Sequence, residues 1–130
     1  MTSHYMRIMV KDSFRNVFGA LSGKFGNIYA RKHEKSGTSS LGIILDEKFF
    51  FRVESDAALL IVVKEISDAQ TEVEVLSCAG GHGLMGISYS AHSDYAHDVI
   101  TFLEDSGFKT ECQNEIDYFD REKCRLLGEK

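Results

Sequence analysis

Apolar residues recur at spacings of three and four in two stretches of the chain, and this pattern predicts helices that each bury one stripe. The first stretch begins after Asp12 and Ser13, either of which can cap a helix by accepting an unpaired backbone N–H. Its three glycines lie on the face opposite the stripe, so either the helix ends near Ser22 or these glycines let another backbone approach closely. The residues of the stripe are Phe14, Val17, Phe18, Leu21, Phe25 and Ile28.

The second helical stretch has clear signals at both ends. Ser93 is the expected N-cap. Gly107 follows the last apolar turn and is expected to take a positive φ, because a residue without a Cβ enters the left-handed region without strain. Phe108 is then expected to pack back on Leu103. The predicted buried stripe comprises Tyr95, Ala96, Val99, Ile100 and Leu103.

Alternation of apolar and polar residues with a period of two predicts the strands. In residues 41–54 we expect the odd positions, from Leu41 to Val53, to face the core. Residues 57–66 are apolar without a break through Val63, which is typical of a central strand covered on both faces. Short loops between consecutive strands favour an antiparallel meander. Further strands are expected at residues 5–11, 71–79 and 87–90.

Together these elements predict an α+β fold, a two-layer sandwich in which an antiparallel sheet of four or five strands carries two helices on one face. The length of 130 residues and the 43% hydrophobic content fit one domain with its own core. We expect residues 1–108 to form that domain. Residues 109–130 are expected to be a C-terminal extension that packs on the domain or on a partner.

Charge and cysteine content narrow the classes of partner and the compartment. Fifteen Lys and Arg against 20 Asp and Glu give a net charge of -5, which argues against a nucleic-acid partner. No stretch approaches the roughly 20 apolar residues of a membrane span, and no export signal is visible, so we expect no membrane partner and a cytoplasmic location. Cys78, Cys112 and Cys124 are too widely spaced for a disulfide framework or a zinc knuckle.

Three short segments in the middle of the chain carry a family resemblance. They are EKFFFR at residues 47–52, AAL at residues 57–59 and GGHGL at residues 80–84, followed by a helix that contains Tyr95. This combination resembles a small, uncharacterised bacterial family known only as a domain of unknown function. The resemblance covers residues 41–103, and the tail from Lys109 departs from it. It implies the domain boundaries and no activity.

The glycine-rich segment of residues 81–86 fits the pattern Gly-x-Gly-x-x-Gly of dinucleotide-binding proteins. In that fingerprint the glycine turn leads straight into a helix whose N-terminus holds pyrophosphate. Here residues 87–90 intervene before any predicted helix. The pattern therefore favours a turn between strands over a dinucleotide site, and we expect no cofactor.

A group of histidines near the same turn has metal-ligand chemistry. His92 and His97 are five residues apart, about 140° around a helix, so they do not share one face. A three-ligand site from His82, Asp94 and His97 is one interpretation. Ordinary surface residues near a helix N-terminus are the other, and we expect no stoichiometric metal. The candidate binding residues are Gly81, His82, Gly83, His92, Asp94 and His97, with a metal-binding or hydrolytic function as the alternative to the one below.

The face of the sheet away from the helices carries more apolar side chains than a solvated face should. The tail, a second subunit or a ligand would cover them, although scattered exposed apolar residues are also common. We therefore predict a non-catalytic binding or self-associating domain, rather than an enzyme, with a homodimer or an unidentified small ligand as the partner. The candidate interface residues are Ile44, Phe50, Leu60 and Val62.

Overall fold

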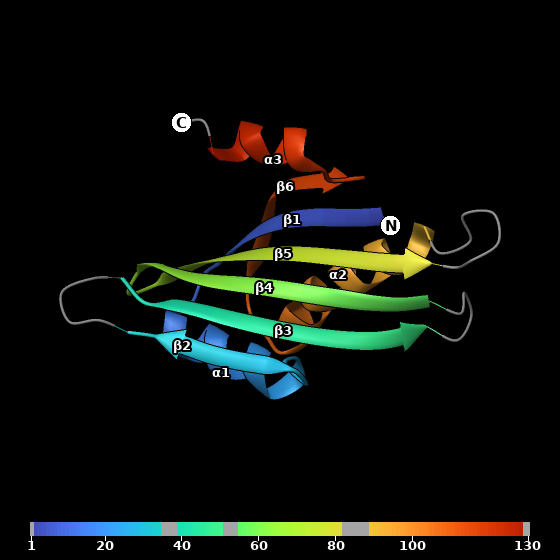
Figure 1. The fold of residues 1–130 in the computed structure, drawn as a ribbon. Helices are drawn as coiled ribbons and strands as arrows, with labels where there is room; N and C mark the ends of the chain where they lie inside the picture. The colour runs from blue at the N-terminus through green and yellow to red at the C-terminus, as the bar shows by residue number, and fades with distance from the viewer. Residues whose placement is uncertain (1, 35–38, 51–54, 82–88, 129–130) are drawn as a thin grey trace.

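The computed structural model describes residues 2–34, 39–50, 55–81 and 89–128. Within them, an antiparallel six-stranded sheet has the order β2-β3-β4-β5-β1-β6 (Figure 1). The strands are β1 (Thr2–Val10), β2 (Tyr29–His33), β3 (Leu41–Phe50), β4 (Ser55–Ser67), β5 (Gln70–Gly81) and β6 (Thr110–Asp117). The helices are α1 (Phe14–Lys24), α2 (Tyr89–Asp105) and α3 (Arg121–Gly128).

Helices α1 and α2 lie on the same face of the sheet, behind it in Figure 1. The α+β class and the antiparallel sheet are thus confirmed, but the sheet is larger than predicted because β2 and β6 were missed. Both are edge strands, and every residue of β2 is exposed. Such strands are held by the hydrogen-bond ladder to β3 and β1 rather than by buried side chains, so they lack the apolar alternation that predicts a strand.

Helix α1 begins and ends close to the predicted points. The Ser13 side chain accepts a hydrogen bond from the Asn16 backbone N–H at 3.2 Å, which confirms the N-cap. The predicted stripe is buried from Phe14 to Phe25. Ile28 is 52% exposed, so its inclusion in the stripe was wrong. The helix has already ended at Lys24, and Gly26, at φ 97°, turns the chain towards β2.

Helix α2 begins earlier than predicted, at Tyr89, so Ser93 lies inside the helix and is not its cap. The strand predicted at residues 87–90 is wrong for Tyr89 and Ser90, which are helical, and residues 87 and 88 lie outside the described residues. The C-terminal end is as predicted. Gly107 has a φ of 94°, and the Phe108 N–H donates to the Leu103 carbonyl at 3.0 Å. The stripe residues Tyr95, Ala96, Val99 and Leu103 are buried.

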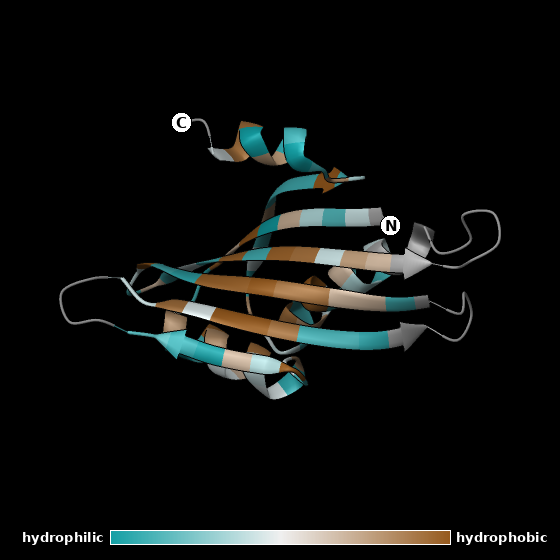
Figure 2. Cartoon of the chain, in the orientation of Figure 1, coloured by the Kyte–Doolittle hydropathy of each residue, from teal (hydrophilic) through white to brown (hydrophobic). Residues whose placement is uncertain are grey.

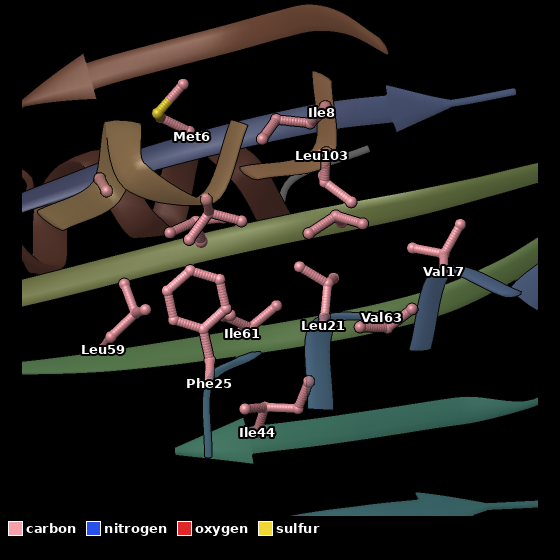
Figure 3. Close-up of a cluster of buried hydrophobic side chains, with 14 of the residues drawn as sticks. Met6, Ile8, Val17, Leu21, Phe25, Ile44, Leu59, Ile61, Val63 and Leu103 are labelled. Atoms are coloured by element: carbon pink, nitrogen blue, oxygen red, sulfur yellow. The ribbon is translucent and has the colours of Figure 1, made fainter. Parts of the chain in front are cut away.

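Strand β3 faces the opposite way from the prediction. The even positions Gly42, Ile44 and Asp46 are buried under the helices, and the odd positions Leu41, Ile43 and Leu45 are only half-buried on the other face. Gly42 decides the orientation, because a Cβ there would lie 2.5 Å from Cε1 of Phe18 in α1. The error arose because the helix-free side of this strand, with Leu41, Ile43 and Leu45, is more apolar than the inner side, where Gly42 and Asp46 accompany Ile44. Ile44 belongs to the core (Figure 3), so its assignment to the outer face was wrong.

In the part of the chain that the structure describes, helices cover strand β4 on one face only, which corrects the prediction of cover on both. Leu59, Ile61 and Val63 point into the core beneath the helices (Figure 3), whereas Leu60 and Val62 are half-buried on the other face. The apolar residues coloured brown along the middle of β3, β4 and β5 in Figure 2 therefore include both core residues and residues of the helix-free face.

The C-terminal residues continue the sheet. Strand β6 pairs with β1, and α3 follows it at the edge of the molecule (Figure 1). Just after β6, the Phe119 N–H donates to the Ser3 carbonyl at 3.0 Å, and the Phe119 ring stacks on Tyr5 with centroids 5.0 Å apart. Among the helices of the described residues, none is both long and apolar enough to cross a membrane.

Candidate functional site

The structure places the predicted binding residues in different surroundings. Gly81 ends β5, whereas His82 and Gly83 lie outside the described residues, as does the side chain of His92 within α2. Asp94 is exposed on α2. The position of His97 was not anticipated, because it contacts His4 of β1 and Glu115 of β6 as well as Ser93 of its own helix.

His97 belongs to a cluster of histidines and carboxylates between α2, β1 and β6. Its Nε2 lies 2.7 Å from Oε2 of Glu115, and Nε2 of His4 lies 2.6 Å from the same oxygen. Nδ1 of His4 lies 3.1 Å from Oδ1 of Asp117, and the two imidazole centroids are 5.4 Å apart. His4 is 3% exposed, so a titratable ring is buried here among acids.

The sheet topology creates this cluster. Strand β1 lies between β5 and β6, and in its register His4 is opposite Asp117 while Met6 is opposite Glu115. His4 and Met6 share the helix-covered face, so the two acids of β6 lie on that face too. His4 and Glu115 are 111 residues apart in the chain, and no local pattern links them. His4, Glu115 and Asp117 therefore could not be predicted as a cluster from the sequence.

A pocket of about 450 Å³ lies on the other side of α2, between that helix, the end of α1 and β3. The rings of Phe25 and Phe102 meet edge to face in its wall, with centroids 5.8 Å apart. Its lining residues are Lys24, Phe25, Asp46, Lys48, Tyr95, Asp98, Thr101, Phe102 and Asp105.

Asp46 and Tyr95 are the buried polar residues in the lining of the pocket. One carboxylate oxygen of Asp46 accepts from the backbone N–H groups of Gly26 and Asn27, at 2.8 and 2.9 Å, and the other accepts from the Tyr95 hydroxyl. Burial, followed by this hydrogen bond, raises the pKa of Tyr95 above its ordinary value, so the hydroxyl stays protonated. The Asp46 carboxylate thereby ties β3 to the turn after α1 and to α2.

The mouth of the pocket carries charges of both signs. Nζ of Lys48 lies 3.7 Å from Oδ2 of Asp98, and both side chains are about half-exposed. Lys24 and Asp105 are exposed as well. An apolar and aromatic wall therefore opens to solvent through a ring of charged groups.

The helix-free face of the sheet is the third feature. Its neighbouring strands place Ile43 opposite Val62, and Leu60 between Leu45 and Leu76. These five side chains are half-buried, and in the described part of the chain no helix crosses them (Figure 1). The side chain of Phe50, predicted to share this face, lies outside the described residues.

A polar network borders this apolar band. Nζ of Lys64 lies 2.7 Å from Glu74 and 3.7 Å from Glu72, and the Tyr5 hydroxyl donates to Glu74 at 2.6 Å. Burial alone would raise the pKa of Glu74, but hydrogen bonds from Lys64 and Tyr5 outweigh it and hold the pKa below its usual value. The hydrogen bond to Glu74 raises the pKa of Lys64 in turn.

No family model and no curated protein matches the chain. Among solved structures, it is similar to the di-domain ARO/CYC BexL from the BE-7585A biosynthetic pathway, with a TM-score of 0.45 and 11% identity over 81% of this chain. The chain spans 46% of BexL. An uncharacterised protein from Bacillus thuringiensis has a TM-score of 0.41 and 10% identity, covering 79% of this chain and 97% of its own. A conserved protein from Geobacillus kaustophilus has a TM-score of 0.38 and 12% identity, covering 84% and 99%.

Proposed function

We propose that this chain is a non-catalytic binding domain that holds a small amphipathic molecule in the pocket between α1, β3 and α2. The observation that carries the proposal is the pocket itself, a hollow of about 450 Å³ with Phe25 and Phe102 in its wall. Ligand sites of soluble proteins have volumes of roughly 300–1,000 Å³ and combine apolar walls with a few polar groups. The pocket matches both properties.

The chemistry of the lining favours a ligand with an apolar body and a polar end. The two phenylalanine rings offer an aromatic or aliphatic body a surface to pack on. Lys48 and Asp98 at the mouth offer a charged donor and a charged acceptor. A ligand with a carboxylate, an amine or both would place that group at the mouth and its apolar part inside.

The buried polar groups support a binding role rather than catalysis. A general base needs a lone pair directed at the substrate, and a general acid needs a pKa near the working pH. The oxygens of Asp46 already accept three hydrogen bonds. Burial raises the pKa of Tyr95, so the hydroxyl gives up its proton less readily. Both groups are therefore suited to holding the walls of the pocket together.

A ligand screen with two matched variants tests this function. Thr101→Trp places an indole at the pocket from an exposed position of α2, and Glu104→Trp places the same group on the same helix outside the lining. Thermal-shift and ligand-observed NMR screening of small amphipathic acids and amines should find binders. Their affinity should fall at least about tenfold in Thr101→Trp and stay unchanged in Glu104→Trp, a difference of about 1.4 kcal/mol. Equal binding by the two variants would contradict the proposal.

Self-association is a second candidate function, favoured by the continuous apolar band on the helix-free face. Apolar patches of a few hundred Å² on a monomer commonly mark interaction sites. A second copy suits this surface because Lys64 and Glu72, which pair within one chain, border the same band and can exchange partners across a two-fold axis. Leu60→Lys should turn a dimer into a monomer in a solution-mass measurement, whereas Glu104→Lys on α2 should not. A wild-type monomer at high concentration would end this candidate.

The proposed compartment is the cytoplasm. Its support is the state of the cysteines, because Cys78, Cys112 and Cys124 are all free, and Cys112 and Cys124 are exposed. Exposed thiols persist in reducing compartments and tend to oxidise outside them. We also propose that residues 109–130 are an extension that packs on a domain of residues 1–108.

A further inference from the structure

We propose that His4, Glu115 and His97 form a binding site for one zinc-type divalent metal ion. The site is distinct from the ligand pocket and does not depend on it, because it lies on the side of α2 that faces β1 and β6. Two imidazole nitrogens and one carboxylate oxygen, from three separate elements, all lie within 4.8 Å of one another. Sequence spacing had predicted no metal because it compared only residues near one another in the chain.

The two distances from Glu115 to the histidine nitrogens reach tetrahedral values after a small adjustment. Zinc bonds of about 2.0–2.2 Å to histidine nitrogen and carboxylate oxygen set ligand atoms roughly 3.3–3.5 Å apart. The distances from Oε2 of Glu115 to Nε2 of His4 and of His97 are 2.6 and 2.7 Å. Each of these two distances therefore lengthens by less than about 1 Å when an ion replaces the hydrogen bonds. Side-chain rotation of Glu115, which is 39% exposed, can supply that movement.

The outer nitrogens of both rings already have the partners that metal-bound histidines use. Nδ1 of His4 lies 3.1 Å from a carboxylate oxygen of Asp117, and Nδ1 of His97 lies 3.4 Å from the Ser93 hydroxyl. Such partners fix the tautomer and orient Nε2 as the ligand atom. This ordered outer shell distinguishes the cluster from a histidine that simply forms a surface ion pair.

The donor set selects the class of metal. Two imidazoles and one carboxylate suit zinc and its neighbours in the first transition series, whereas magnesium and calcium prefer oxygen ligands alone. The His4 side chain is 4% exposed, while those of His97 and Glu115 are 45% and 39% exposed. The ion would thus be anchored on its inner side and open to solvent on the other, where a water molecule completes four-coordination.

Zinc titration of the intact chain tests the proposal. Chelator-stripped protein is dialysed against zinc chloride and its metal content measured, and binding is followed by calorimetry and with cobalt(II) as an optical probe of tetrahedral geometry. We expect about one zinc per chain. His97→Ala should lower zinc affinity by at least about tenfold, and Asp117→Asn by roughly 10–100-fold. His33→Ala, on the exposed strand β2 at the far edge of the sheet, is the matched control and should bind as the wild type does.

Two further measurements show whether a loss of zinc binding comes from the lost ligand or from misfolding. His97 is half-exposed, so its alanine variant should fold, and circular dichroism checks this. Nitrogen NMR of the wild type adds a readout that needs no variant, because zinc should shift Nε2 of two histidines and leave His33 unchanged. The proposal is overturned if zinc binds at well below one equivalent, or if His97→Ala binds it as tightly as His33→Ala. It is also overturned if the NMR shifts fall on histidines other than His4 and His97.

Discussion

Replacing Gly42 with alanine adds one methyl group where β3 passes beneath α1. The new Cβ would lie 2.5 Å from Cε1 of Phe18, well inside the 3.4–4 Å of ordinary contact, so the ring must move by about 1 Å. Phe18 has little freedom to do so, because it is buried and stacks on Phe14 with centroids 5.7 Å apart. Overpacking of this kind costs about 1–3 kcal/mol. Alanine loses less backbone entropy on folding than glycine, which stabilises by about 0.5–1 kcal/mol. The midpoints of the two ranges leave a net destabilisation of about 1 kcal/mol.

Chemical denaturation of two glycine variants measures this effect with an internal control. Gly19→Ala makes the same change on the exposed side of α1, where a Cβ meets nothing within 4 Å, and should stabilise by up to about 1 kcal/mol. Adding Phe18→Leu to Gly42→Ala should make the pair less destabilising than the sum of the two changes, by about 0.5 kcal/mol or more. If Gly42→Ala leaves the free energy of unfolding within about 0.5 kcal/mol of wild type, β3 does not face α1 as described.

Three further changes test other parts of the fold by denaturation. Leu103→Ala should cost about 2–5 kcal/mol, because this side chain of α2 is fully buried in the core, and a loss below about 0.5 kcal/mol would remove it from the core. Gly107→Ala should cost about 1 kcal/mol at its φ of 94°, whereas no loss would argue against the left-handed helix end. Glu74→Gln removes a carboxylate whose pKa lies below its ordinary 4.5 in the folded state. The ionised carboxylate stabilises the fold above pH 4.5, and this stabilisation is lost as the pH falls through the lowered pKa. The wild type should therefore be more stable than the variant near neutral pH and lose this advantage in acid. Parallel stability–pH curves would refute this.

Local signals accounted for the features that sequence analysis predicted correctly. The stripe of α2 and the positive φ of Gly107 depend on residues within one or two turns of each other, and both were recovered. The Ser13 cap of α1 has the same local character. The α+β class follows from these helices and the alternating strands between them.

The features that were missed depend on contacts between distant residues. Strand β3 has apolar side chains on both faces, and only the close approach of Phe18 to Gly42 decides which face is inner. Strand β6 has few apolar residues and forms because β1 offers it a free edge. His4 and His97 come together only because β1 lies between β5 and β6. No short segment of the sequence predicts that strand order.

The most direct test of the binding function is an NMR titration that locates the ligand. Uniformly nitrogen-labelled protein is titrated with the tightest amphipathic compound from the screen, and amide shifts are mapped on the structure. We expect saturable shifts around the pocket, at Asp46, Thr101 and Phe102, and no shifts in β4 at Leu60 and Val62. Shifts confined to Leu60, Val62 and the rest of the helix-free face would contradict it.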